Sequence, residues 1–309
     1  MNFQQLRIIR ETVRRNFNLT EAAQALLTSQ SGVSKHIRDL EEELGLEIFV
    51  RRGKRLLGLT EPGREVIAVA ERVLLETENL VQLSEQLSKS DSGTLHIATT
   101  HTQARYVLPA IIARFKAAYP DVRLVLHQAS PKEIATILLE GRTDVGIATD
   151  TLDDHPGILA FPYLTWSHVV VVPKGHPLLA VPNLTLDAIA EHPLITYDEG
   201  LTGRARIDQA FENAGVVPDI AMSALDADVI KAYVELGLGV GIIGEMAFDP
   251  VRDQGLAVAS GAHLFAQSTS SLAIHRGRFL RSYVYRFIEL CAPELTEQSI
   301  RRANEASRG

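Results

Sequence analysis

Apolar residues recur at helical spacing in the N-terminal part of the chain and predict three short helices. The first is expected over residues 2–15, and its apolar face consists of Phe3, Leu6, Ile9 and Val13. Thr20 is expected to cap a second helix over residues 21–27, because its hydroxyl can accept a first-turn amide. Ser29 and Gly45 are expected to begin and end the third helix. Its apolar stripe consists of Val33, Ile37, Leu40 and Leu44.

The polar face of the third helix carries amides, hydroxyls and cations. Its members are Gln30, Ser31, Ser34, Lys35 and Arg38. Such side chains hydrogen-bond base edges and phosphates. Two short helices joined by a tight turn are typical of a helix-turn-helix, whose second helix enters the major groove of DNA. An ordinary solvated pair of helices has the same pattern and remains the alternative.

Two short apolar segments follow, over residues 47–50 and 56–59, and predict a β-hairpin. The turn that joins them concentrates four cations, which are Arg51, Arg52, Lys54 and Arg55. DNA phosphates would balance this charge, so we interpret the hairpin as the wing of a winged helix-turn-helix. A solvated hairpin tip is the alternative.

A long helix is expected from Glu61 to about Lys89, after the cap Thr60. Apolar residues recur every seven positions along it in two neighbouring rows. These are Val66, Val73, Leu80 and Leu87, and Ile67, Leu74 and Val81. The spacing is typical of a coiled coil and favours a dimer, although packing against the chain's own body would use the same stripe. The polar segment 88–93 indicates a domain boundary.

Strands and helices alternate beyond this boundary. Strands are expected over residues 94–100, 122–128, 144–149, 168–172, 239–243 and 271–275. Helices are expected over residues 103–118, 131–140, 186–190, 204–214, 226–236 and 281–290. The alternation predicts two small α/β lobes with parallel sheets, hinged like a clamshell. The polar residues after Pro293 are expected to fray.

Polar segments at strand and helix ends are the candidates for a ligand site, because ligands of open α/β sheets lie beyond the carboxyl ends of the strands. Residues 99–103 follow the first strand, residues 200–203 precede a helix, and Thr149 ends another strand. Hydroxyls and free amides at a helix N-terminus suit a small anion. Each threonine would serve equally as a simple helix cap.

The formal charge of −7 disfavours DNA binding until it is divided along the chain. Residues 1–60 contain ten Lys/Arg and seven Asp/Glu, and the remaining residues carry 21 and 31. A basic module on an acidic body fits local contact with phosphates. The single cysteine, Cys291, excludes an internal disulfide and is expected to be a buried thiol.

No export signal or membrane span is apparent, so a cytoplasmic location is expected. No metal-ligand spacing links His155, His168, His176 and His192, and no catalytic partner accompanies His101. We therefore expect neither a metal site nor a cofactor, and no enzyme. A solute-binding protein or an enzyme built on two α/β lobes is the rival from another class.

Several motifs together resemble LysR-type transcriptional regulators over essentially the whole chain. They are SQSGVSKHIRDLEEELG (29–45), IFVRRGKRLLGLTEPG (48–63), the long helix and the two-lobed part. Within that family the chain is similar to the CysB/Cbl branch, whose members activate sulfur assimilation. The stretches that carry this are TTHTQARYVLP (99–109), TGR (202–204), DADVIKAYVELGLGVGII (226–243) and FLRSYVYRFIELCAPELT (279–296).

The resemblance implies an α+β protein of three parts. They are a winged helix-turn-helix DNA-binding domain (1–60), a linker and dimerisation helix (61–92) and an effector domain (93–309) like periplasmic binding proteins. Its lobe I would span about 93–165 and 269–295, and its lobe II about 166–268. Trp166 would lie at the junction of the lobes, where packing is its expected role.

The resemblance also implies ligands and partners. Sulfate, N-acetylserine or O-acetylserine would bind between the lobes, at the positions Thr100, Thr102, Gln103, Thr149 and Thr202. DNA would be read by Gln30, Ser31, Ser34, Lys35 and Arg38, with the wing cations on phosphates. Ser31-Gly32 replaces the Pro-Ala common in the family, so the chain departs from the family pattern at these two positions of the third helix. A homotetrameric activator of cysteine biosynthesis genes, a dimer of dimers that contacts RNA polymerase, is expected; a LysR regulator of another organic anion is the alternative.

Overall fold

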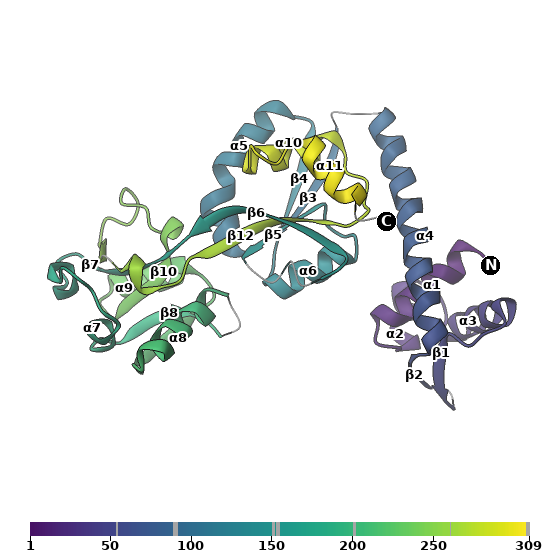
Figure 1. Cartoon of the computed structure of the whole chain (residues 1–309), viewed down its shortest axis with the longest axis horizontal. Coiled ribbons are helices and arrows are strands. Elements are labelled where there is room, and N and C mark those ends of the chain that lie inside the picture. The colour runs from purple at the N-terminus through teal and green to yellow at the C-terminus, as the bar shows by residue number, and fades with distance from the viewer. Residues whose placement is uncertain are drawn as a thin grey trace. The chain divides into compact units, whose positions relative to one another are not determined.

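The computed structural model describes residues 1–53, 55–88, 92–149, 152, 155–199, 202–259 and 261–306, without the side chains of Thr202 and Ala306. The chain divides into two compact units, Met1–Leu87 and Ser88–Gly309 (Figure 1). No helix in the described ranges is long and apolar enough to cross a membrane. The expected α+β fold, with a helix-turn-helix followed by a two-lobed α/β part, is confirmed.

The first unit contains three short helices, a hairpin and a long helix. These are α1 (Phe3–Arg14), α2 (Leu19–Ala25), α3 (Gln30–Leu44), the antiparallel strands β1 (Phe49–Arg52) and β2 (Arg55–Leu59), and α4 (Glu61–Ser88). Ser29 caps α3 by accepting the Gly32 amide at 3.1 Å, and Gly45 ends it with a φ of +68°. Val33, Ile37 and Leu40 are buried in the core between the helices and the hairpin.

Three local expectations for this unit are wrong. Asn18, not Thr20, caps α2: its side chain accepts the amides of Thr20 and Glu21, so the helix begins two residues early. Leu44 is 38% exposed, because α3 ends there and the core does not extend past Leu40. Arg51 and Arg52 belong to β1 and Arg55 belongs to β2, and not to the turn.

The long helix α4 covers part of one predicted row near its start and leaves both rows exposed near its end. Thr60 caps it, with its hydroxyl accepting the Gly63 amide at 2.9 Å. Ile67 and Leu74 are buried in the core of their own unit. Toward the end of the helix both rows are exposed, with Leu80 at 68%, Val81 at 55% and Leu87 at 80%.

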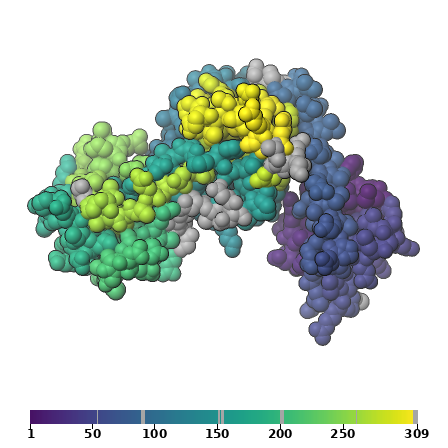
Figure 2. All heavy atoms as spheres, in the orientation of Figure 1, coloured from purple at the N-terminus to yellow at the C-terminus, as the bar shows by residue number. Residues whose placement is uncertain are grey.

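Lobe I of the second unit is built on a five-stranded sheet in the order β4-β3-β5-β12-β6. Its strands are β3 (Gly93–Thr99), β4 (Val122–Gln128), β5 (Val145–Thr149), β6 (Ile158–Trp166) and β12 (Ser268–His275). Its helices are η1 (Gln103–Val107), α5 (Leu108–Ala118), α6 (Pro131–Leu139), α10 (Ser282–Cys291) and α11 (Glu297–Ala306). Figure 2 shows the C-terminal helices, in yellow, packed on this lobe.

Lobe II has a second five-stranded sheet in the order β11-β7-β10-β8-β9. Its strands are β7 (His168–Pro173), β8 (Leu194–Tyr197), β9 (Ile220–Ala224), β10 (Val240–Gly244) and β11 (Leu256–Ala259). Its helices are α7 (Leu186–Ala190), α8 (Thr202–Ala214), α9 (Ala227–Glu235) and the 3-10 turns η3 (Pro177–Ala180), η4 (Glu245–Ala247) and η5 (Ala262–Leu264). The chain enters this lobe after Trp166 and returns at Ser268, which pairs with Trp166 in lobe I.

Several expectations for the second unit are corrected. Both sheets are mixed, because β12 runs antiparallel to its neighbours in lobe I and β7 to its neighbours in lobe II. Strands β6, β8, β9 and β11 were not expected, and the helix expected over 103–118 begins as the π-helix η1. The described part of the tail, up to residue 306, is not frayed: α11 buries Ile300 completely, and Asn304 accepts the Gly277 amide at 2.6 Å.

Candidate functional site

The polar face of α3 is available to a ligand as large as DNA. Gln30, Ser31, Lys35 and Arg38 are exposed, and Ser34 is half-buried. The Ser31 hydroxyl lies 3.1 Å from that of Ser29, at the start of the helix. These side chains project opposite the buried stripe, as expected for a helix that reads a groove.

The wing cations differ in their surroundings. Arg51 Nη2 lies 2.6 Å from Glu41 Oε2, and the other oxygen of Glu41 accepts the amides of Ile48 and Phe49. Arg51 therefore helps to fix the hairpin against α3. Arg52 and Arg55 are exposed, and Lys54 lies outside the described residues.

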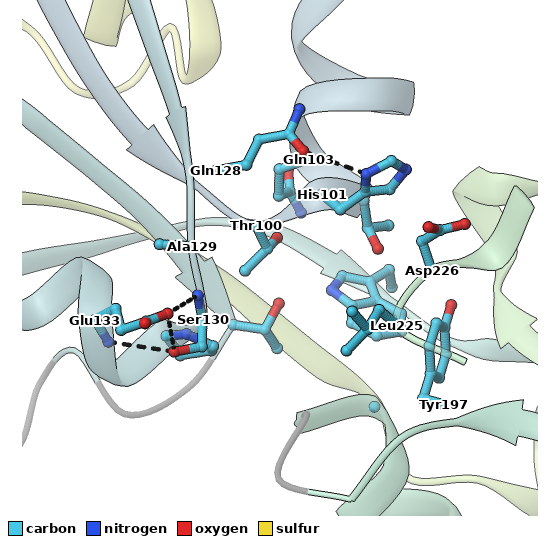
Figure 3. A pocket seen from close by; sticks show the side chains of 15 residues that line it. Thr100, His101, Gln103, Gln128, Ala129, Ser130, Glu133, Tyr197, Leu225 and Asp226 are labelled. Atoms are coloured by element: carbon cyan, nitrogen blue, oxygen red, sulfur yellow. Dashed lines mark hydrogen bonds between the residues drawn. The ribbon is translucent and has the colours of Figure 1, made fainter. Parts of the chain in front are cut away.

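A cavity of about 410 Å³ lies between the two lobes of the second unit. From lobe I it is lined by Thr100, His101, Thr102, Gln103, Gln128, Ala129, Ser130, Pro131, Glu133 and Thr149. Trp166, Tyr197, Gly203, Leu225 and Asp226 complete the lining (Figure 3). Four of the five predicted effector residues thus meet in one pocket, and the side chain of the fifth, Thr202, lies outside the described part.

The Ser270 hydroxyl hydrogen-bonds three residues that line this pocket. It accepts Gln103 Nε2–H at 2.9 Å and Trp166 Nε1–H at 3.1 Å, and it lies 2.8 Å from Thr149 Oγ1. Since both nitrogens can only donate, the Ser270 proton points to Thr149. Tyr163 donates to the amide oxygen of Gln103. The Gln103 side chain is therefore held by its own protein, with 1% of the residue exposed, and it shapes the pocket rather than reaching into it.

Two of the helices that begin at the pocket cap themselves. Ser130 and Glu133 form a capping box on α6, with the Glu133 carboxylate accepting the Ser130 amide and hydroxyl at 2.9 and 2.7 Å. These bonds lower the pKa of Glu133. Asp226 caps α9 through the Val229 amide at 2.9 Å.

The turn that leads into η1 has no such cap. The first amide bonded along it is that of Ala104, which donates to Thr100 O at 3.1 Å. No described side chain caps η1 at Thr102. Amides before Ala104 and the hydroxyls of Thr100 and Thr102 are thus the donors that an anion would meet.

No lysine or arginine belongs to the described lining. Arg204, the nearest candidate in the sequence, donates from Nε to Asp208 at 2.6 Å and from Nη1 to Tyr197 O at 3.2 Å. Apart from the His101 ring, hydroxyls and amides therefore carry any anion recognition by the described lining residues. An anion bound without a paired cation is released readily, which suits a sensor.

A charged cluster joins the lobes beside the pocket. Asp228 of α9 accepts Tyr106 Oη–H at 2.7 Å and Arg105 Nε–H at 3.0 Å from η1. Lys231 lies 3.5 Å from the same carboxylate. Burial raises the pKa of Asp228, but the hydrogen bonds from Tyr106 and Arg105 and the charge of Lys231 outweigh it, so the pKa lies below its ordinary value.

This cluster is the one place in the described chain where metal-ligand atoms gather. Those of His101, Asp226 and Asp228 lie within 4.8 Å of one another. Because Arg105 and Lys231 already neutralise Asp228, a cation there would meet like charge. The group suits an ion-pair network better than a metal ion.

Several residues that line the pocket or hydrogen-bond its lining were missed from the sequence. Ser270 and Tyr163 lie on strands whose extent or existence was not expected, so nothing marked them. Asp226 is the first residue of a predicted helix and Leu225 directly precedes it, so a capping residue at a helix start was the available signal.

Comparisons with known proteins agree with this architecture. The family model described as "LysR substrate binding domain" matches residues 88–296, and "Bacterial regulatory helix-turn-helix protein, lysR family" matches residues 3–64. The chain belongs to the LysR family of transcriptional regulators. As a LysR-family protein it is a DNA-binding regulator with an effector-binding domain, and not an enzyme.

Individual relatives of this LysR-family chain match it along nearly its full length. It is 57% identical over 300 residues to the HTH-type transcriptional regulator SsuR of Burkholderia cenocepacia, covering 97% of each chain. It is 52% identical over 302 residues to the HTH-type transcriptional regulator cbl of Escherichia coli K12, covering 98% of this chain and 96% of the relative. The crystal structure of the cofactor-binding domain of the Cbl transcriptional regulator aligns with a TM-score of 0.66 and 48% identity, over 69% of this chain and 93% of that one.

Proposed function

We propose that this LysR-family regulator activates genes of sulfur assimilation and cysteine biosynthesis in response to sulfate, N-acetylserine or O-acetylserine. The observation that carries the proposal is the pocket of about 410 Å³ in which Thr100, Thr102 and Thr149 meet beside the uncapped start of η1. Hydroxyls and free amides in that arrangement suit an oxyanion or a carboxylate. The similarity to Cbl and SsuR along nearly the full chain supports the sulfur-related role.

Calorimetric titration of the full chain with sulfate, N-acetylserine and O-acetylserine tests the effector. Thr100→Ala should weaken binding of the true effector about fivefold or more, because it removes a hydroxyl partner, and leave promoter affinity nearly unchanged. Thr185→Ala, which alters a helix cap away from the pocket lining, is the matched control. Equal loss of effector and DNA binding in Thr100→Ala would refute the site.

A LysR regulator of a different organic anion is the second candidate. The apolar side chains in the lining, Trp166 and Leu225, suit any ligand with a carbon skeleton and so support another organic anion as much as an acetylserine. Binding of another organic anion, with no heat from sulfate or either acetylserine, would select this candidate.

We infer that α3 and the wing read the promoter. Lys35→Ala and Arg55→Ala should reduce promoter affinity and flatten the slope of log affinity against log salt by about one unit for each phosphate that the variant no longer neutralises. Arg55 is preferred to Arg51 as a probe, because Arg51 is paired with Glu41 and its loss would disturb the hairpin. Unchanged affinity and slope in both variants would contradict the assignment.

The three parts of the chain divide the work in this proposal. DNA reading, linkage and effector binding are assigned to residues 1–60, 61–92 and 93–309, with α4 forming a dimer and two dimers forming a tetramer. A regulator of chromosomal promoters works where the DNA is, in the cytoplasm, and an activator acts through RNA polymerase. Effector binding that favours one arrangement of the lobes would shift the population of that arrangement and so change the bound DNA.

A further inference from the structure

The effector pocket is larger than its anion-binding end requires. Its volume of about 410 Å³ falls in the range of roughly 300–1,000 Å³ that is typical of sites for organic ligands. A small tetrahedral oxyanion at Thr100 and Thr102 would leave most of this space to solvent. The rest of the lining therefore indicates what else the occupant carries.

An apolar side chain stands exposed on the opposite side of the pocket. Leu225, directly after β9, is 71% exposed, whereas the neighbouring Trp166 and Tyr197 are 7% and 5% exposed. Figure 3 shows Leu225 and Asp226 across the pocket from Thr100. Covering an exposed leucine is favourable only for a ligand with carbon surface.

The next residue offers an unused acceptor. Oδ1 of Asp226 accepts the Val229 amide at 2.9 Å, and its other oxygen has no hydrogen-bond partner among the described residues. The other carboxylate in the lining, that of Glu133, accepts both Ser130 bonds on Oε2, and it lies on lobe I, so Asp226 is the carboxylate that lobe II contributes to the lining. An ionised carboxylate can only accept, so the free oxygen of Asp226 calls for an N–H or O–H group on the ligand.

From these observations we propose that the effector is an organic anion that spans the pocket. Its anionic end binds the start of η1 at Thr100 and Thr102, its carbon skeleton covers Leu225, and an N–H or O–H group donates to Asp226. The inference rests on the proposed effector site and deepens it: inorganic sulfate occupies only the lobe I end. A ligand held by both lobes stabilises their closed arrangement, and one held by lobe I alone does not.

The test compares N-acetylserine with inorganic sulfate by calorimetric titration of the full chain. Asp226→Asn keeps the helix cap, because asparagine caps as well as aspartate, but replaces the free acceptor with a donor. Its dissociation constant for N-acetylserine should rise about tenfold or more, while that for sulfate stays within about twofold. Leu225→Ala should show the same selectivity. Asp187→Asn, exposed in the first turn of α7, should change neither value.

Each other result has a distinct meaning. Equal effects of Asp226→Asn on both ligands, or none on either, would overturn the inference. Wild-type protein that binds sulfate but neither acetylserine would overturn it too, and would leave the proposed effector site standing. Wild-type protein that binds none of the three would overturn the proposed effectors themselves.

Discussion

Leu27, in the turn between α2 and α3, has a backbone conformation that is unfavourable for leucine. Its φ is +50° and its side chain is 96% exposed. The turn is held by its amide on Gln24 O at 3.2 Å and by the Thr28 amide on Ala23 O at 2.9 Å, which end α2. A left-handed conformation costs an L-residue with a Cβ about 1–2 kcal/mol, and here no packing offsets the cost.

Leu27→Asn should therefore stabilise the protein. Asparagine tolerates the left-handed region, so the free energy of unfolding should rise by roughly 0.5–1 kcal/mol. Urea unfolding of the full chain, followed by circular dichroism, measures this. Leu26→Asn is the matched control and should destabilise, because Leu26 packs against the core; a loss of stability in Leu27→Asn would contradict the account.

His168 makes the stability of the protein depend on pH. The ring is fully buried beside Trp166 and Phe265, and neither nitrogen has a hydrogen-bond partner among the described residues. Burial, with the nearby charge of Arg206, lowers its pKa from 6.5 to about 4. The folded state therefore excludes a proton that the unfolded state binds once the pH falls below about 6.5.

The buried His168 should make the protein less stable in mild acid. The contribution of the neutral His168 ring to the free energy of unfolding is fully present above the pKa of His168 in the unfolded state. It declines as the pH falls toward the pKa in the folded state, by roughly 2 kcal/mol between pH 7.5 and pH 5. His168→Phe should remove this part of the decline and fold normally at pH 7.5, since an apolar ring fits the aromatic surroundings. Denaturant titrations at the two pH values measure it, and an unaltered decline in the variant would exclude His168 as its source.

At the scale of elements, α4 divides its apolar residues between two uses. Ile67 and Leu74 are buried in the first unit, whereas Val73, Leu80 and Leu87 are 39%, 68% and 80% exposed. An exposed apolar row along a helix of this length is typical of a coiled-coil partner surface. The heptad spacing in the sequence revealed both rows but could not say that the chain covers only Ile67 and Leu74 of the second row and leaves Val81 55% exposed.

Leu80→Glu should therefore weaken self-association without unfolding the helix. A charge in the middle of an apolar seam should raise the dimer dissociation constant about tenfold or more. Gln82→Glu, which adds the same charge outside the two rows, should leave it unchanged. Sedimentation velocity over a range of protein concentrations distinguishes these outcomes, and an undisturbed dimer in Leu80→Glu would place the interface elsewhere.

Local patterns predicted helices well and sheet topology poorly. α3, α7 and β4 appear nearly where spacing and caps placed them, because those signals lie within a few neighbouring residues. The direction of strand pairing depends on contacts distant in sequence, so the antiparallel β12 could not be read from alternation. The polar composition of α11 hid a helix whose Ile300 and Asn304 are fixed by tertiary contacts.

The candidate site was predictable only in part, for the same reason. Thr100 and Thr102 follow a strand and Thr149 ends one, and these positions, together with the family resemblance, marked them. The role of Gln103 depends on Ser270 and Tyr163, which are brought to it by β12 and β6. No local sequence pattern shows that these three side chains come together in the fold.

At the scale of the second unit, the cluster around Asp228 links the lobes beside the pocket. Tyr106 and Arg105 approach it from η1, which begins directly after the proposed anion-binding residues. A shift of η1 on ligand binding would therefore move these bonds. Because the pKa of Asp228 lies below its ordinary value, the carboxylate stays charged at neutral pH, and the link is lost only as the pH falls below the ordinary carboxyl range.

Asp228→Asn should loosen this link and lower effector affinity about two- to fivefold at both pH 7 and pH 5, the size expected of a partly exposed ion pair. Within the wild-type protein the contribution of the link should be the same at the two pH values. Asp249→Asn, on the same lobe, is the control. Calorimetry provides the measurement, and a difference from wild type at only one pH would mean that another group titrates there.

The pairing of Trp166 with Ser268 puts the points of departure and return of lobe II on adjacent strands. Lobe II is thus an insertion between two paired residues of lobe I. Another domain could replace it if the ends of that domain lie as close together as Trp166 and Ser268. Such a transplant would leave the first unit, α4 and the anion-binding turn intact. Lobe II can therefore be exchanged for a lobe that prefers another ligand, which would make the protein a reporter for a different metabolite.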